Sequence, residues 1–218
     1  MKRFDEWFFP DAETLLIDEM TKHNIRVDGR LTYQYHKYLT VLQLCQQRRG
    51  AIDIGAHVGL WSYFLTQAFD SVDAFEPMLE HCQCLLTNVT SPKLTLHHVA
   101  LGDYRGHVRM QQQLGHSGGT FVSQQDQGEL VIMRPLDSYA LTEIDLIKID
   151  VEGYERPVIE GALSTIMRER PVIIVEQVDN LSQRYGYPHT AVERLHELGY
   201  ELVTTLGPDA ILRMPAGS

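Results

Sequence analysis

The feature that most constrains the fold of this chain is a regular alternation that begins at residue 51. Short apolar runs that end in an acid or a glycine alternate with longer amphipathic stretches, which is typical of repeated βα units. The pattern predicts an α/β fold with a mostly parallel sheet and helices on both faces. The predicted strands are 51–54, 72–75, 94–99, 146–149, 172–175 and 201–205, and the predicted helices are 60–68, 79–88, 156–167 and 191–198.

Two segments depart from this alternation. Residues 106–134 hold a polar, glycine-containing piece, 115–120, between two strand-like pieces, which predicts an antiparallel excursion or loop over one face. Residues 210–214 follow Gly207-Pro208-Asp209 closely enough to form a hairpin with the preceding strand. We therefore expect a seventh strand that closes the parallel sheet as an antiparallel edge.

The first 48 residues precede the alternation and form a separate part of the chain. Apolar residues recur there at roughly helical spacing, over 12–20 and again over 31–45. We predict a helical extension over 1–48 that is a candidate cover for the ligand site of the main domain, 49–218. Its aromatic cluster either packs the extension onto the domain or lines a ligand pocket; the cluster consists of Tyr33, Tyr35, His36 and Tyr38.

The composition limits the partners and the location of the protein. A formal net charge of -10 argues against a generic nucleic-acid binder, because a polyanion requires a basic face that releases its counterions. Cys45, Cys82 and Cys84 lack the spacing of a zinc cage and cannot all pair, which favours a reduced, cytoplasmic compartment. No apolar run has the length of a signal or membrane-spanning segment, so we expect no membrane insertion.

The end of the first predicted strand is the first place to look for a ligand, because ligands bind beyond the carboxyl ends of such strands. The strand ends in Asp53-Ile54-Gly55-Ala56-His57-Val58-Gly59. This is not the G-x-G-x-x-G of dinucleotide folds, whose extra glycine lets backbone amides approach a pyrophosphate. An aspartate before the glycines suits a cofactor without phosphate, whose ammonium and carboxylate ends need an acceptor and a backbone donor.

An acid ends the second predicted strand, in Phe75-Glu76-Pro77. A carboxylate there can accept hydrogen bonds from both hydroxyls of a ribose, as an acid does at this place in dinucleotide folds. The alternative is that Gly55 and Gly59 only make a tight turn and that Glu76 is a solvated strand end. The spacing of the pair across one βαβ unit favours a nucleoside site.

Carboxylates also gather where two later strands end. Asp150 and Glu152 lie on the same side if the extended conformation continues past residue 149, and Glu176 would lie beside them in a parallel sheet. Clustered carboxylates raise one another's proton affinity. One of them could therefore act as a general base on a hydroxyl, or the three could bind a divalent cation.

Two further residues have alternative interpretations. Glu155 directly precedes the helix predicted from residue 156, where an acid can stabilise the helix N-terminus instead of serving chemistry. His116 is preceded by a glycine in the excursion, and an imidazole near the cleft can move protons at neutral pH. We include His116 among the candidate catalytic residues.

Six blocks of sequence occur in a specific order, at 53–59, 74–77, 99–103, 136–137, 147–155 and 170–176. In this order and spacing, over roughly residues 50 to 205, they resemble the FkbM family of methyltransferases. The block from Lys148 to Glu155, following the glycine loop, is the most specific of them. One departure is His57, where the family usually carries asparagine.

The resemblance implies a Rossmann-like class I methyltransferase with S-adenosylmethionine (SAM) as cofactor. It implies O-methylation of a hydroxyl on a sugar or small natural product, with the extension and the insertion near 106–134 setting this acceptor. The loop at 53–59 would hold the methionine part, Glu76 the ribose, and residues 100–102 the adenine. The implied cofactor residues are Asp53, Gly55, Ala56, His57, Gly59, Glu76, Pro77, Ala100, Leu101 and Gly102; the candidate catalytic residues are Asp150, Glu152 and His116; and the candidate metal ligands are Asp150, Glu152 and Glu176.

Two other functions remain compatible with a sheet of this kind. One is a nicotinamide-dependent oxidoreductase, which the missing G-x-G-x-x-G disfavours. The other is a binding module that keeps the adenosyl pocket without catalysis. The sequence itself does not identify the acceptor, since a fold does not determine a substrate.

Overall fold

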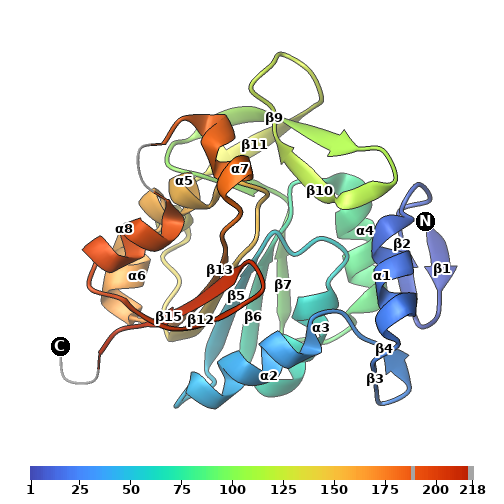
Figure 1. The fold of residues 1–218 in the computed structure, drawn as a ribbon, viewed down its shortest axis with the longest axis horizontal. Helices are drawn as coiled ribbons and strands as arrows, with labels where there is room; N and C mark the ends of the chain where they lie inside the picture. The colour runs from blue at the N-terminus through green and yellow to red at the C-terminus, as the bar shows by residue number, and fades with distance from the viewer. Residues whose placement is uncertain (188–189, 216–218) are drawn as a thin grey trace.

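The central sheet contains the strands that the sequence predicts (Figure 1). The structure is a computed structural model that describes residues 1–187 and 190–215. Within them the sheet has seven strands, in the order β14 (Glu201–Leu206), β15 (Asp209–Arg213), β13 (Val172–Glu176), β12 (Ile144–Ile149), β5 (Gly50–Ile54), β6 (Ser71–Phe75) and β7 (Leu94–His97). The strands from β13 to β7 are parallel, and β15 is antiparallel to both neighbours, which confirms the predicted topology.

The edge of the sheet differs from the prediction. The hairpin is present, but β15 lies between β13 and β14, so β14 is the edge strand. Burial explains the order, because Ala210, Ile211 and Leu212 are buried whereas Leu202 and Val203 are exposed. The more apolar strand therefore takes the interior position, and the strand with more polar residues takes the edge.

Helices cover both faces of the sheet, as predicted. Alternate residues along a strand point to opposite faces, so Ile52 and Ile147 pack under one layer of helices while Ala51 and Leu146 pack under the other. The first layer comprises α5 (Glu155–Glu160), α6 (Leu163–Glu169) and α8 (Ala191–Glu197), and the second comprises α2 (Tyr35–Leu44), α3 (Leu60–Ala68) and α4 (Leu79–Asn88).

Two predicted elements are shorter in the structure. The helix predicted over 156–167 is broken at Gly161 into α5 and α6, at a point where a Cβ atom would lie 1.9 Å from the carbonyl oxygen of Gly102. The strand predicted over 94–99 ends at His97. The chain then leaves the central sheet to form β8 (Ala100–Leu101), which pairs with a different sheet.

The predicted excursion forms a second sheet, of order β10-β9-β11-β8. Its strands β9 (Gly106–Gln113), β10 (His116–Val122) and β11 (Glu129–Arg134) pair antiparallel, as expected. The piece 115–120, expected as a loop, lies mostly inside β10. This sheet, hereafter the insertion, lies across the top of the central strands in Figure 1 and packs through Met110 and Met133 against Met78 and Tyr154.

The N-terminal extension contains helices, as predicted, and also two short hairpins that the sequence analysis missed. Strands of two or three residues are too short to show a hydrophobic period. Trp7, Met20 and Leu31 of the extension pack against Val58 and Leu60, next to the glycine loop. The elements are β1 (Lys2–Phe4), β2 (Trp7–Phe9), α1 (Leu15–His23), β3 (Arg26–Val27) and β4 (Arg30–Leu31), followed by α2.

Three short helical segments complete the described chain: η1 (Leu136–Tyr139), α7 (Asp179–Ser182) and η2 (Gln183–Tyr185). Cys45, Cys82 and Cys84 are buried free thiols. In the part of the chain that the structure describes, no helix has the length and apolar character to cross a membrane.

Asn88 attaches the extension to the domain, and its replacement tests this attachment. Its side-chain amide donates to the carbonyls of Phe8 (2.9 Å) and Val58 (2.8 Å) and accepts from the amide of Phe8 (2.7 Å). We expect Asn88→Ala to lower the free energy of unfolding by about 3 kcal/mol, because buried backbone groups lose their partners. Urea denaturation measures the loss. The exposed neighbour Thr87→Ala should change it by less than about 0.5 kcal/mol, and equal effects would contradict this role.

Candidate active site

Two cavities open at the carboxyl ends of the central strands. The first, of about 550 Å³, lies under the insertion, and the second, of about 780 Å³, lies beside the extension. We name them the insertion-side cavity and the extension-side cavity. They meet at the residues that line both, which are Gly55, His57, Gly118, Asp150 and Glu152.

Gly55 brings the first strand end close to the fourth. Its φ is +74°, and a Cβ atom there would lie 1.8 Å from the backbone oxygen of Asp150. Only glycine therefore permits this approach. The contact places the loop after β5 directly beside the acids after β12.

Lys148 connects the same two strand ends from below. Its ammonium donates to the carbonyl of Gly55 (3.2 Å) and lies 3.4 Å from carboxylate oxygens of Asp53 and Asp150. Burial lowers the pKa of Lys148, but the carboxylates of Asp150 and Asp53 outweigh burial and raise it above its usual value. Asp53 is fully buried and also accepts from Ser62 Oγ (2.6 Å). It lines neither cavity, so its effect on a ligand passes through Lys148.

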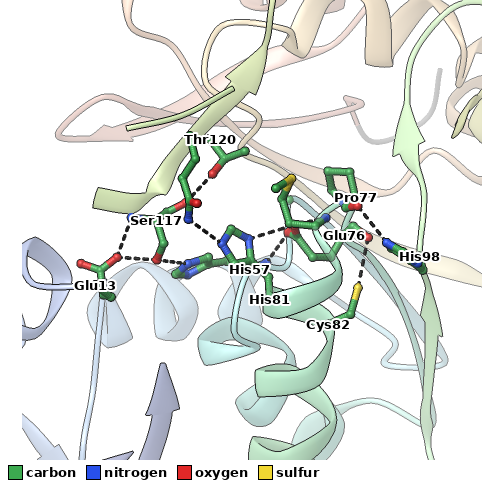
Figure 2. A network of polar contacts seen from close by, with 12 residues as sticks. Glu13, His57, Glu76, Pro77, His81, Cys82, His98, Ser117 and Thr120 are labelled. Carbon is green, nitrogen blue, oxygen red and sulfur yellow. Dashed lines mark hydrogen bonds and ion pairs between the residues drawn. The ribbon is translucent and has the colours of Figure 1, made fainter. Parts of the chain in front are cut away.

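Glu76 lies in the wall of the insertion-side cavity within a network of hydrogen bonds (Figure 2). Its carboxylate accepts from the backbone amides of His57 (2.8 Å) and Met78 (2.9 Å), and it lies 3.0 Å from His81 Nδ1. A carboxylate offers about four lone-pair sites, so three donors leave about one site free. The carboxylate thus already has protein partners, and the expectation that it also receives ribose hydroxyls stays a prediction.

The rest of the insertion-side cavity is mainly apolar. Ala100 and Leu101 line it as expected for an adenine site, and Pro77 lies at its edge. Gly102 does not line it, because Gly102 backs onto the Met133 sulfur. Gly59 does not line either cavity, because it begins α3 and packs against α4. Lining residues that the sequence analysis missed include Met110, Ser117, Thr120 and Val122 of the insertion and Tyr154.

Asp150, Glu152 and Glu176 come together as predicted, although the chain turns at Glu152 (φ 57°) and does not stay extended past residue 149 as the prediction assumed. Each offers a carboxylate oxygen, and these oxygens lie within 4.8 Å of one another, a spacing that suits either proton sharing or a divalent cation. Burial, then the Asp150 charge, raises the pKa of Glu152 to about 8 and that of Glu176 to about 9. Glu155 is different, because it accepts from the amides of Val151 and Gly153 and so stabilises the loop before α5.

The extension-side cavity combines these acids with residues of the extension and α3. Tyr33 and Trp61 supply aromatic surface, and Leu16 and Ala56 supply apolar surface. Of the two roles considered for the aromatic cluster, Tyr33 thus lines a pocket, whereas Tyr35 and Tyr38 pack with the core. His116 lines this cavity, as do Leu15, Glu19, Gln34, Leu60 and Lys148. Lys148 is the one lysine or arginine among the described lining residues.

Comparisons with known proteins place these features in context. A family model described as the methyltransferase FkbM domain matches residues 53–202. No curated protein sequence matches the chain.

Solved structures with related folds share little sequence with the chain. A methyltransferase FkbM from Methylobacillus flagellatus is 19% identical, with a TM-score of 0.51 over 77% of this chain and 44% of that chain. A precorrin-8w decarboxylase from Methanobacterium thermoautotrophicum is 13% identical, with a TM-score of 0.54 over 99% and 100% of the two chains. A putative methyltransferase from Streptococcus mutans, in complex with S-adenosylhomocysteine (SAH), is 12% identical, with a TM-score of 0.50 over 82% of this chain and 94% of that chain. The chain thus spans under half of the first of these proteins.

The acidic cluster predicts an unusual dependence of stability on pH. The raised pKa of Glu152 means that the folded state keeps a proton that the unfolded chain releases between about pH 4.5 and 8, so stability from this group is lost as pH rises through that window. Glu152→Gln removes this titration. We expect the variant to gain about 4 kcal/mol over the wild type in free energy of unfolding between pH 5 and pH 9, since about 3 pH units of this window separate the two pKa values at about 1.4 kcal/mol per unit. Urea denaturation at both pH values measures this, with exposed Glu129→Gln as control, and a pH-independent difference would contradict it.

Proposed function

The chain belongs to the FkbM methyltransferase domain family, and from that premise we propose that it transfers a methyl group from SAM to a hydroxyl of a small molecule or saccharide. The observation that carries the proposal is the meeting of two cavities at Gly55, Asp150 and Glu152. The insertion-side cavity is mostly apolar, with the buried carboxylate of Glu76 in its wall and Asp150 and Glu152 where it meets the other cavity, and we propose that it holds an adenosyl group. The other combines aromatic rings with acids and fits a polar acceptor.

The cofactor site has a definite orientation under this proposal. Ala100 and Leu101 border the adenine, Glu76 accepts a hydrogen bond from the ribose, and the loop at Gly55 holds the methionine part near Asp150. When bound, SAM supplies a methyl group that is already activated by its sulfonium. The protein therefore has to align the acceptor with this methyl group and to remove one proton.

We assign the proton transfer to Glu152. Its pKa of about 8 lies near neutral pH, where a general base is most effective. Asp150 lies 3.4 Å from the Lys148 ammonium, so it is better suited to orienting the acceptor than to taking its proton. His116 lines the same cavity and is a second candidate for hydrogen bonding to the acceptor.

The walls of the extension-side cavity support an acceptor without negative charge. Glu19, Asp150, Glu152 and Glu176 line it, and the one lining lysine is already paired with two aspartates. A phosphorylated acceptor would meet these carboxylates with no free cation to compensate, which like-charge repulsion disfavours. Sugar hydroxyls can donate to the carboxylates and stack on aromatic rings. The extension, 1–48, is thus proposed to cover and select the acceptor.

Ligand binding tests the proposed cofactor. We expect the purified protein to bind SAM and SAH in calorimetric titrations and to show no affinity for NAD. Glu76→Gln keeps the shape of the side chain but removes its charge, so we expect about tenfold weaker SAH binding. Glu129→Gln, on the exposed edge of the insertion, is the matched control. Preference for NAD, or no binding of either adenosyl compound, would refute the proposed function.

Turnover tests the assignment of the base. In an acceptor screen that follows SAH release, we expect Glu152→Gln to lower turnover about 10²–10⁴-fold, the usual contribution of a general base, while SAH affinity stays within about twofold of wild type. Unchanged turnover would exclude Glu152 as the base.

A chelator separates this mechanism from the metal alternative. Turnover that persists in EDTA supports proton transfer by Glu152. Turnover that EDTA abolishes and Mg²⁺ restores would show that Asp150, Glu152 and Glu176 hold a cation instead. SAH that binds without turnover of any acceptor would favour the binding module.

A further inference from the structure

Glu13 is a buried acid of the extension that lies outside the segment matched by the family model. Its side chain is completely inaccessible to solvent. It accepts hydrogen bonds from the backbone amides of Leu16 (2.7 Å) and Ser117 (2.7 Å), and it also accepts from the Ser117 hydroxyl. Glu13 therefore connects the extension to strand β10 of the insertion at the edge of both cavities (Figure 2).

The single proton of the Ser117 hydroxyl determines the next hydrogen bond in this series. An ionised carboxylate only accepts, so the hydroxyl proton points to Glu13. His57 Nε2 lies 2.7 Å from Ser117 Oγ. Because the Ser117 proton is already used, His57 Nε2 must donate to Ser117 Oγ. The contacts therefore select the neutral His57 tautomer that carries its proton on Nε2.

His57 in turn holds Glu76. His57 has a φ of 51°, in the left-handed region that few residues other than glycine adopt. In this conformation its backbone amide donates to Glu76 Oε2 (2.8 Å). Its ring also packs edge-on against His81, at 4.5 Å between centroids, and His81 Nδ1 lies 3.0 Å from Glu76 Oε1. The orientation of His57 thus determines where the free lone pair of Glu76 points.

We infer that Glu13 and Ser117 are positioning residues for the ribose of the cofactor, acting through His57 on Glu76. The inference rests on the proposed function, since it concerns the carboxylate that receives the ribose. Neither side chain needs to touch the reacting atoms. Their replacement frees the His57 ring, which lets the loop and Glu76 move, so the protein loses discrimination between a ribose and a deoxyribose.

The experiment compares SAH with its 2′-deoxy and 3′-deoxy analogues. By calorimetry, we expect the wild type to bind SAH about tenfold more tightly than one of the analogues, the effect of one hydrogen bond to a carboxylate. Glu13→Gln and Ser117→Ala should reduce this preference to about twofold or less. Thr14→Ala is the matched control, because Thr14 Oγ1 donates to the Gly115 carbonyl and so joins the extension to the insertion without touching His57.

The tautomer of His57 provides a readout that a purely structural role would not change. We expect the nitrogen chemical shifts of the free wild-type protein to show the Nε2–H form, and Glu13→Gln and Ser117→Ala to show a mixture. Thermal unfolding checks that the variants fold. If Ser117→Ala does not fold, Glu13→Gln, which keeps the shape of the side chain, remains as the test.

Two results would overturn the inference. One is that Glu13→Gln and Ser117→Ala both keep the wild-type preference for SAH over its deoxy analogues and the wild-type tautomer of His57. The other is that Thr14→Ala loses this preference to the same extent as they do. Failure of the wild type to bind SAH would remove the proposed function, and the ribose role with it. In that case the tautomer measurement still shows whether Glu13 and Ser117 orient His57.

Discussion

The site depends on one buried interaction, the contact of Lys148 with two strand ends at once. Its ammonium lies between the carboxylates of Asp53 and Asp150 and donates to the Gly55 carbonyl. A buried charge is costly unless it is paired, so these groups are constrained to remain together. Because Gly55 and Asp150 line both cavities, Lys148 holds the place where a methyl donor and an acceptor would meet.

Much of the central fold can be predicted because it is encoded locally. The period of apolar residues predicts α3 and α4 with their observed bounds, and the strand ends predict that Asp150, Glu152 and Glu176 lie together. Contacts between distant segments decide the rest. The break at Gly161 lies against the Gly102 carbonyl, a contact between distant segments that no local pattern reveals.

The wall of the insertion-side cavity shows the same limit. Ser117 appears in the sequence as part of a polar, glycine-rich piece, and only the pairing of β10 with β9 and the contact with Glu13 bring it to the cavity. The left-handed backbone at His57 is partly predictable from the sequence, since asparagine and histidine both adopt this conformation more readily than most residues. The contact of the His57 ring with Ser117, in contrast, is visible only in the structure.

The most direct test of the account is a crystal structure of the protein with SAH bound. The account predicts an adenine against Ala100 and Leu101, one ribose hydroxyl on Glu76, and a sulfur that faces the extension-side cavity next to Glu152. Clear density for SAH elsewhere on the protein, or an orientation that points the sulfur away from Asp150 and Glu152, would contradict it.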